Sequence, residues 1–436
     1  MKAENKNISL LVSSRTISKI GDVMFDFANN TFLAGINPNS LFLVGIYQSL
    51  ESLIGIFLNL FGGVVADSFN RKRIVIATDF LSGLACILLS FITKEKWLIY
   101  AIVVTNIILA IISSFSGPAY KAVTKEVVRE EQISRLNSLL ETSSTIVKVT
   151  VPMIAVFLYK ILKVHGVLLL DGISFTLAAL LVHFITTVKE DPAVNNKVTV
   201  RSVMNDMLLG FKYIFDHKQI AIIILLSALV NFMLAAYNLL LPYSNQMFSG
   251  MPEGMYGMFL TAEAIGGLLG AVLSGFLNKK MSSMWLMCFL GGSGLALALA
   301  PILYFYSHNQ IIVSLSPALF NLLLTIFNIQ FFSIVQREVD NEFLGRVFGI
   351  VFTVAVLFMP IGTWIFSIIL QAKNSLNFLF VGLMIAALSV LFALLLMLIS
   401  QDFTTQAIRL TDFLPAVFLL CMTFQKCEDL CFSSGT

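Results

Sequence analysis

Charged residues are scarce in this sequence, because Asp, Glu, Lys and Arg together occupy only 12% of its 436 positions. A soluble domain of ordinary composition carries roughly 25%, since its surface must face water. Hydrophobic residues reach 58%, and the mean hydropathy is +0.89. Most of the outer surface must therefore face an apolar medium. This composition excludes an ordinary soluble enzyme and indicates a protein embedded in lipid.

Cysteine and histidine are also few. Five cysteines, of which Cys86 and Cys288 fall inside apolar runs, provide no disulfide framework and fit no zinc motif. The four histidines are scattered, and neither HExxH nor CxxC occurs. The chain also lacks the GxxxxGK[ST] loop that holds nucleotide phosphates, which disfavours an ATP-driven pump. We therefore expect no catalytic residue, no metal site and no cofactor.

Apolar runs of membrane-spanning length divide the rest of the chain. A bilayer core about 30 Å thick needs about 20 helical residues to cross it. The sequence predicts twelve such spans in two groups of six, and the first is the least hydrophobic. The predicted spans are 9–34, 41–66, 74–93, 97–117, 138–160, 165–188, 219–245, 255–277, 284–306, 310–335, 347–371 and 374–400.

The predicted fold is an all-α membrane protein, with twelve transmembrane helices in two six-helix bundles, 1–188 and 219–400. Residues 401–436 form a tail whose apolar run is too short to span a membrane. The linker 189–218 has apolar residues at helical spacing, which predicts an amphipathic helix on the membrane surface, although a plain linker fits the same pattern. Those apolar residues are Met204, Met207, Leu208, Phe211 and Ile214.

Lysine and arginine are distributed unequally between the predicted loops. Basic residues stay preferentially in the cytoplasm. If the N-terminus is inside, 22 of the 28 basic residues lie in cytoplasmic segments, 5 lie outside, and Lys148 falls within a span. Adding or removing one span would move alternate loops to the other side and destroy this ratio. We therefore expect both termini, the linker and the tail in the cytoplasm.

Two loops of the second half repeat features of the first half. Gly63 and Gly275 open the segments GVVADSFNRKR and GFLNKKM at an offset of 212, and Arg135 and Arg346 lie in similar segments at an offset of 211. This agreement indicates duplication of a six-span unit. Parallel repeats of this kind occur in one large class of secondary transporters, whereas a channel would not need the duplicated loops.

The most specific segment is the short loop from Gly63 to the bases Arg71, Lys72 and Arg73. Glycine permits close approach of helices, Asp67 can cap or pair with a helix N-terminus, and the bases stay in the cytoplasm. A simple orientation signal would need the bases, but neither the glycine nor the aspartate.

In this form the loop resembles the signature loop between helices 2 and 3 of the major facilitator superfamily, with Asn70 where the family usually has glycine. The segment Ser18–Asp22 resembles a motif in helix 1 of the bacterial drug:proton antiporters related to macrolide efflux proteins. Enterobactin and lysophospholipid transporters share much of this pattern. Further matches are Gly117-Pro118-Ala119, Leu136-Asn137-Ser138, Leu170–Phe175 and Gly345-Arg346-Val347.

The resemblance implies alternating access, in which two bundles rock around a central site and the loop Gly63–Arg73 acts as a conformational latch. It implies proton-coupled efflux of macrolides or other amphipathic drugs across a bacterial plasma membrane. The alternative is an exporter or flippase of a lipid or siderophore. Two departures bear on proton coupling: Asn106 is the only counterpart of a helix 4 arginine, and Thr150-Val151-Pro152 lacks the glycines of a helix 5 motif.

The expected partners are a small amphipathic substrate and the lipid bilayer, and not nucleic acid. We expect the protein to act as a monomer. The expected energy source is the proton gradient.

Acids inside predicted spans are the candidates for binding protons or substrate, because charge within a membrane is costly and usually functional. They are Asp22, Asp26, Glu51, Asp171 and Glu263. Asp22 and Asp26 are four residues apart and share one face of a helix. Two carboxylates this close resist double ionisation, which suits a proton-carrying site.

Structural interpretations of the charged residues remain open. Asp22 could pair with Lys19 or Arg15, and Asp171 could be either structural or functional. Lys148 could pair with an acid or extend toward the cytoplasm. We expect Asp79 to pair with the bases of the loop Gly63–Arg73.

Overall fold

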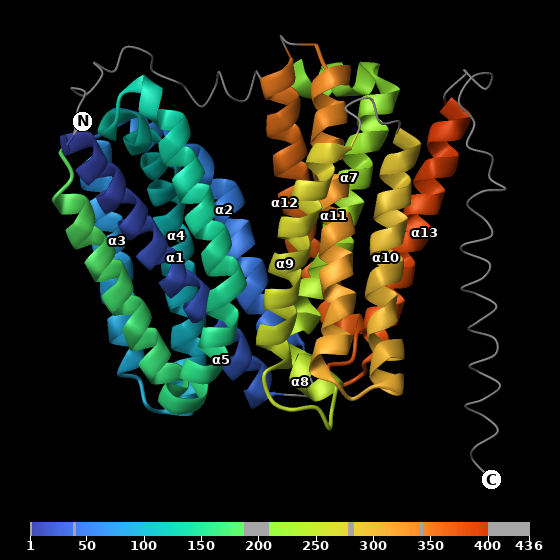
Figure 1. Ribbon diagram of the computed structural model, residues 1–436, viewed down its shortest axis with the longest axis horizontal. Helices are drawn as coiled ribbons and strands as arrows, with labels where there is room; N and C mark the ends of the chain where they lie inside the picture. The colour runs from blue at the N-terminus through green and yellow to red at the C-terminus, as the bar shows by residue number, and fades with distance from the viewer. Residues whose placement is uncertain (1, 38–40, 187–208, 278–282, 341–342, 400–436) are drawn as a thin grey trace. The chain divides into compact units, whose positions relative to one another are not determined.

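The computed structural model describes residues 2–37, 41–186, 209–277, 283–340 and 343–399, and within these ranges all regular elements are helices (Figure 1). Residues 1–392 form one compact unit. The described part of a second unit, 393–399, is the end of the last helix. The predicted tail and most of the predicted linker lie outside the described residues.

Five helices make up the first half of the chain. They are α1 (Lys2–Ile36), α2 (Phe42–Ser68), α3 (Arg71–Ser90), α4 (Glu95–Val127) and α5 (Glu130–His183). Helix α5 covers two predicted spans, 138–160 and 165–188, and is divided at Lys163, whose φ of 56° and ψ of −172° are not helical. The first group of predicted spans therefore agrees with the observed helices, apart from shifts at their ends.

The second half has six long helices. They are α7 (Lys218–Leu240), α9 (Met255–Phe276), α10 (Ser283–Tyr306), α11 (Gln310–Glu338), α12 (Leu344–Ile369) and α13 (Leu376–Ile399), with the short turns η1 (Leu241–Tyr243) and α8 (Ser244–Met247) after α7. In the described part of the chain, nine helices are long and apolar enough to cross a membrane. Helix α5 counts once among these. Helix α1, which carries charges, is not among them, and α2 contributes only the shorter apolar stretch Phe42–Leu58. The number of twelve spans stays a prediction.

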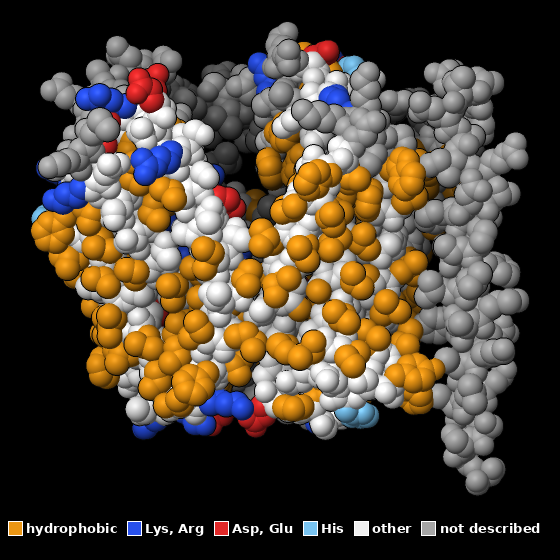
Figure 2. All heavy atoms as spheres, viewed as in Figure 1, with side chains coloured by type: hydrophobic (Ala, Val, Ile, Leu, Met, Phe, Trp, Pro, Cys, Tyr) orange, Lys and Arg blue, Asp and Glu red, His pale blue; other side chains and the backbone are white. Residues whose placement is uncertain are grey.

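Large apolar side chains lie on the outside of these helices. Leu88, Phe157 and Ile368 are 60%, 63% and 69% exposed, respectively. Figure 2 shows hydrophobic side chains over the middle of the visible face and charged side chains mostly toward its two ends. A soluble monomer rarely exposes apolar area of this extent. Helices satisfy their own backbone hydrogen bonds and so can present such a surface to lipid. The predicted all-α membrane fold is confirmed.

Helices α9 and α11 pack closely because small residues lie between them. A Cβ atom on Gly266 would lie 2.0 Å from the carbonyl oxygen of Ala318, and one on Gly270 would lie 2.3 Å from that of Leu322. The two glycines are four residues apart and so share one face of α9. This spacing lets two backbones approach closely in a membrane, where apolar side chains gain little from contact with each other rather than with lipid.

The segment before α7 is anchored on the loop between α11 and α12. Residues 209–216 are helical. The Tyr213 hydroxyl donates to Asp340 Oδ2 at 3.1 Å and accepts from the Asp340 backbone N–H at 3.1 Å, while its ring stacks on Phe343 at 4.4 Å. Burial raises the pKa of Tyr213, so the hydroxyl keeps its proton and remains a donor. The described end of the predicted linker, 209–216, is thus helical, and the rest of the predicted helix, including Met204, Met207 and Leu208, lies outside the described residues.

The first half makes an equivalent contact. Glu4, at the start of α1, forms an ion pair of 3.4 Å with Arg129 in the loop between α4 and α5. In each half, the segment that begins the first helix thus contacts the loop that follows the fourth predicted span. Glu4 and Tyr213 are 209 residues apart, and Arg129 and Asp340 are 211 residues apart. These offsets match those of the two repeated loops and support the predicted duplication.

Candidate functional site

A cavity of about 480 Å³ lies between helices of the two halves. Its lining comes from α1, α2 and α5 on one side and from α7, α9, α11 and α12 on the other. Three acids line it, Asp26, Glu51 and Glu263, together with one base, Lys148. The structure thus brings together three of the five predicted acids. We call this space the central cavity.

Asp26 and Glu51 lie on the side of the central cavity formed by the first half, and both are exposed to internal space. The Tyr47 hydroxyl donates to Asp26 Oδ1 at 3.2 Å. Asn106 of α4 donates from Nδ2 to the Tyr47 backbone oxygen at 2.9 Å. Asn106 therefore positions the backbone of α2 beside Asp26, and it brings no positive charge to the carboxylates.

Glu263 is held on the opposite side. The buried Tyr237 hydroxyl donates to Glu263 Oε1, and the Tyr237 ring lies 4.8 Å from Phe320 and 5.8 Å from Phe378. Asn321 Nδ2 donates to the backbone oxygen of Glu263 at 2.7 Å. Tyr237 of α7 therefore orients this carboxylate, and Asn321 of α11 holds the backbone of α9 beside it.

The two halves touch at one end of the central cavity. Phe27 of α1 stacks on Tyr256 of α9, with ring centroids 5.0 Å apart and an interplanar angle of 11°. Beyond this pair, Lys160 Nζ lies 3.0 Å from Glu253 Oε2, and Gln246 Nε2 donates to the Ala34 backbone oxygen at 3.2 Å. We call this end the closed end.

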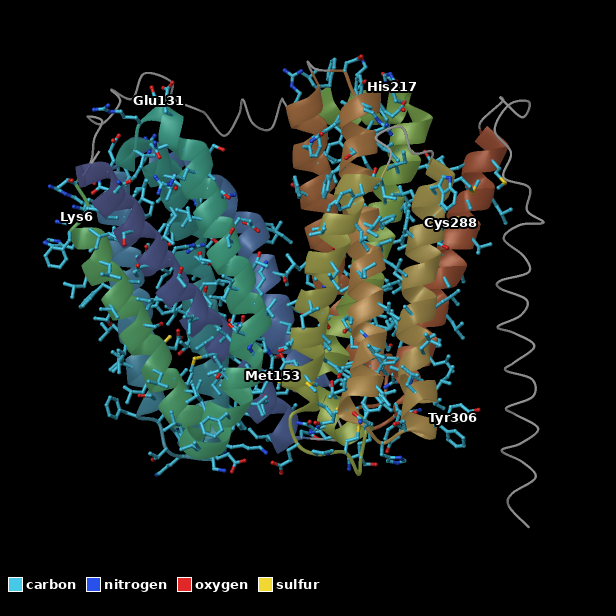
Figure 3. All side chains as sticks on the ribbon, in the orientation of Figure 1. Lys6, Glu131, Met153, His217, Cys288 and Tyr306 are labelled. Carbon is cyan, nitrogen blue, oxygen red and sulfur yellow. The ribbon has the colours of Figure 1, made fainter. Side chains whose placement is uncertain are left out.

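A second space, of about 530 Å³, lies among α1, α4 and α5 and shares Lys148 with the central cavity. We call it the vestibule. Its lining includes Lys121 near the end of α4 and Asn137 near the start of α5. In Figure 3, Glu131 at the start of α5 and His217 before α7 lie at one end of the helices, and Tyr306 lies at the other. The vestibule therefore extends toward the end that carries Glu131.

The other two predicted acids lie apart from the central cavity. Asp22 Oδ2 lies 3.6 Å from Lys19 Nζ, which confirms the ion pair considered for it. Asp171 is fully buried. A Cβ atom on Gly21 would lie 2.2 Å from Asp171 Oδ1 and 2.1 Å from Ser174 Oγ. Glycine in the Ser18–Asp22 motif therefore leaves room for the Asp171 and Ser174 side chains, which a larger residue would displace.

The bases Arg71 and Lys72, at the start of α3, join helix ends within the first half. The predicted loop Gly63–Arg73 is helical apart from Phe69 and Asn70, because α2 continues to Ser68 and α3 begins at Arg71. Arg71 Nη1 lies 2.5 Å from Glu126 Oε1 at the end of α4, and Lys72 Nζ donates to the backbone oxygens of His183 and Ile185 at 2.8 and 2.6 Å. Asn70 caps α3, because its Oδ1 accepts from the Arg73 backbone N–H at 3.0 Å. This cap accounts for asparagine in place of glycine.

The side chains of 59–68, including Gly63 and Asp67, lie outside the described residues, so their role in the latch stays a prediction. The predicted pairing of Asp79 with the bases of this loop is wrong. Asp79 Oδ2 instead accepts from the Tyr120 hydroxyl at 2.7 Å, and Arg15 lies 4.6 Å from the centre of the Tyr120 ring. Asp79 lies about two helical turns beyond Arg71, which places it deeper between α3 and α4.

Glu126→Gln is expected to destabilise the protein and reduce its activity. The Arg71 and Glu126 side chains are 18% and 6% exposed. Removing one partner of a buried ion pair costs about 3–5 kcal/mol, and the partial exposure of Arg71 places the cost near the lower value. Thermal unfolding of the purified protein measures this effect. Arg73→Gln removes a neighbouring exposed base and is the control, for which we expect no change. Equal losses in both variants would contradict a specific role of the Arg71–Glu126 ion pair.

Several contacts around the central cavity were not identified from the sequence, among them Tyr237, Asn321 and the Phe27–Tyr256 pair. Asn321 could have been found, because it is a polar residue within an apolar run. The aromatic residues carry no such signal, since the chain has 38 phenylalanines and 10 tyrosines.

Comparison with known proteins agrees with this architecture. The family model of the Major Facilitator Superfamily matches residues 15–363. Macrolide efflux protein A of Enterococcus faecalis is 24% identical over 306 residues, which cover 69% of this chain and 92% of that protein. The crystal structure of the nucleoside transporter NupG superposes with a TM-score of 0.71 at 14% identity, covering 92% of this chain and 100% of that chain.

A further solved structure shows the same fold. The inward-facing crystal structure of a bacterial homologue of the iron transporter ferroportin superposes with a TM-score of 0.68 at 17% identity. The superposition covers 89% of this chain and 98% of that chain. The match to the family model spans most of the chain, and the helices and the central cavity agree with that fold. The chain therefore belongs to the major facilitator superfamily and is a multi-pass membrane transporter.

Proposed function

We propose that this transporter exports amphipathic cations, macrolides among them, in exchange for protons. The proposal places it in a bacterial plasma membrane, with both termini and the open end of the vestibule in the cytoplasm. The observation that carries it is the composition of the central cavity, in which three acids and one base lie among apolar and aromatic side chains.

The charge of the central cavity favours a cation. Asp26, Glu51 and Glu263 face one positive side chain, Lys148, and an excess of negative charge in a low-dielectric cleft attracts positive ligands. Neither Glu51 nor Glu263 is part of an ion pair within 4 Å among the described residues. A ligand ammonium group would therefore not have to displace a protein cation from these two side chains.

Most of the remaining lining is apolar or aromatic and suits an apolar body. Val23, Phe27, Leu260 and Met359 line the central cavity beside Tyr256. Pockets that bind organic molecules usually combine a mostly apolar lining with a few placed polar groups, and their volumes are about 300–1,000 Å³. A compound with one basic amine and a large apolar skeleton fits this combination. The name of the macrolide efflux protein among the relatives of this chain supports the same class.

Exchange follows if a proton and a ligand cation compete for the same carboxylates. A proton entering from outside neutralises the acids and weakens the hold on the cation, whereas loss of the proton to the cytoplasm restores the binding charge. A pH difference of one unit supplies about 1.4 kcal/mol for each proton. This is enough for roughly a tenfold gradient of ligand.

Transport by inverted membrane vesicles tests the proposal. We expect vesicles with an acidic interior to accumulate macrolides and other amphipathic amines, and a protonophore to abolish the accumulation. Neutral analogues that lack the amine are the control and should accumulate far less. Accumulation of a lipid or a siderophore, without accumulation of any amine, would contradict the proposal and favour the alternative.

A further inference from the structure

A third cavity, of about 200 Å³, lies inside the first half of the chain, among α1 to α5. It shares Asp26 and Glu51 with the central cavity, and most of the rest of its lining is its own. The two carboxylates therefore separate two spaces. We call this third space the inner cavity.

The inner cavity differs from the central cavity in character. Its surface, to which Ser18, Ser82, Ser116 and Asn106 contribute, is mainly polar, whereas that of the central cavity is mainly apolar. Hydroxyl and amide groups provide the two to four hydrogen bonds that hold an internal water molecule. The volume far exceeds the roughly 10–15 Å³ that one water requires. The inner cavity is thus suited to a group of connected waters and is too small for a large organic ligand.

The vestibule adjoins both of the other spaces. It shares Arg15, Lys19 and Gly117 with the inner cavity, but it shares Lys148 with the central cavity. Two routes therefore lead from the vestibule to Asp26 and Glu51. One passes Lys148 and the apolar lining, and the other passes Arg15, Lys19 and the serine-lined space.

We propose that the inner cavity is a proton route, separate from the route of the ligand, by which Asp26 and Glu51 exchange protons with the vestibule. The inference rests on the proposed proton coupling. A bulky ligand in the central cavity covers the direct route, so a proton that it displaces needs another way out. Waters in the inner cavity provide one on the far side of the same carboxylates.

The charged groups along this route come from several helices. Arg15, Lys19 and Asp22 belong to α1, Glu51 to α2 and Asp79 to α3. Lys19 is paired with Asp22, and Arg15 lies over the ring of Tyr120, which also binds Asp79. The lining residues of α4 and α5 carry no charge. The positive groups nearest the vestibule thus lie beside acids, which lowers the barrier to a passing proton.

Filling each cavity separately tests the proposal. Ala110 lines only the inner cavity and Ala264 only the central cavity, so Ala110→Leu and Ala264→Leu are matched variants. We expect Ala110→Leu to reduce pH-driven transport by roughly tenfold or more, as loss of proton transfer does, with unchanged ligand affinity and unchanged counterflow without a pH gradient. Ala264→Leu should instead weaken ligand binding. Full pH-driven transport by Ala110→Leu, or equal behaviour of the two variants, would overturn the proposal.

Thiol labelling provides an independent test that does not depend on transport. In a protein without its five native cysteines, Ser116→Cys reports on the inner cavity and Ala264→Cys on the central cavity. A bound macrolide should slow the reaction of Ala264→Cys with a small water-soluble reagent and leave that of Ser116→Cys unchanged. Protection of both, or no labelling of Ser116→Cys, would overturn the separate route. If the macrolide protects only Ala264→Cys but the wild type shows no pH-driven transport, then the proposed function is wrong while the two cavities are still separate.

Discussion

Asp26→Asn is expected to abolish transport driven by a pH gradient, whereas the exchange of labelled for unlabelled ligand should persist with weaker binding of the cation. Asp26 lies between the inner and central cavities, where protons and ligand can both reach it. Asparagine has nearly the same shape but cannot lose a proton, so the variant keeps the neutral state permanently. Because the charge at this position no longer changes, the affinity for the cation does not depend on pH there, and a pH difference cannot drive its transport.

The size of the effect follows from the free energy available. One proton moving down a membrane potential of 100 mV releases about 2.3 kcal/mol, and each pH unit adds about 1.4 kcal/mol. Exchange of one proton for a ligand with one positive charge is electroneutral, so only the pH difference drives it. The variant should therefore lose nearly all concentrative transport, because the remaining exchange is passive.

Vesicles with an imposed pH gradient measure pH-driven transport. Counterflow without a gradient measures the exchange of labelled for unlabelled ligand. Glu51→Gln is the nearest comparison, since Glu51 adjoins both of the same cavities. Glu131→Gln is the control, because Glu131 is exposed at the start of α5 and lines none of the three cavities. If Asp26→Asn and Glu51→Gln both retained full pH-driven transport, coupling through this site would be wrong, and Asp22, Asp171 and Glu263 would be the next residues to test.

Helical periodicity correctly placed Asp22 and Asp26 on one face of α1, yet the two carboxylates have different surroundings. Asp22 pairs with Lys19 in its own helix, and Asp26 accepts a hydrogen bond from Tyr47 in α2. The first partner can be found from spacing along the chain. The second depends on which helix packs beside α1, and a single sequence of apolar runs does not specify that neighbour.

The fold could be predicted because lipid imposes simple rules on length and hydrophobicity. Because apolar residues fill all the spans alike, hydrophobicity does not show which of them line the site. Gly21 in the Ser18–Asp22 motif looks like a helix-packing residue, and only the structure shows that Asp171 and Ser174 occupy the place of a side chain there. Likewise, Tyr237 is one aromatic residue among many until its hydrogen bond to Glu263 is known.

Joining the two halves covalently at the closed end is expected to stop transport and to preserve ligand binding from the vestibule. The contacts observed there are weak. Lys160 and Glu253 are 51% and 80% exposed, and exposed ion pairs contribute about 0–1 kcal/mol. A stacked aromatic pair such as Phe27 with Tyr256 adds about 0.5–1.5 kcal/mol beyond its buried area. Such contacts can break and re-form, as a protein with two states of similar free energy requires.

A reversible cross-link tests whether the contacts at the closed end break during transport. In the cysteine-free protein, Lys160→Cys and Glu253→Cys can be joined by a thiol reagent about as long as the two replaced side chains. If the closed end must open in every cycle, transport should fall to the background of empty vesicles, because a covalent bond cannot be broken by the proton gradient. Reduction of the cross-link should restore it, and ligand binding to the cross-linked protein should persist throughout.

The matched control joins two residues of the second half near the same end. The Tyr304 hydroxyl donates to the Ser249 backbone oxygen, so Tyr304→Cys with Ser249→Cys gives a cross-link that does not connect the two halves. Transport by this variant should survive cross-linking. Wild-type transport by the fully cross-linked Lys160–Glu253 variant would show that the halves do not separate at the closed end. The path of the ligand across the membrane would then have to lie elsewhere than between Phe27 and Tyr256.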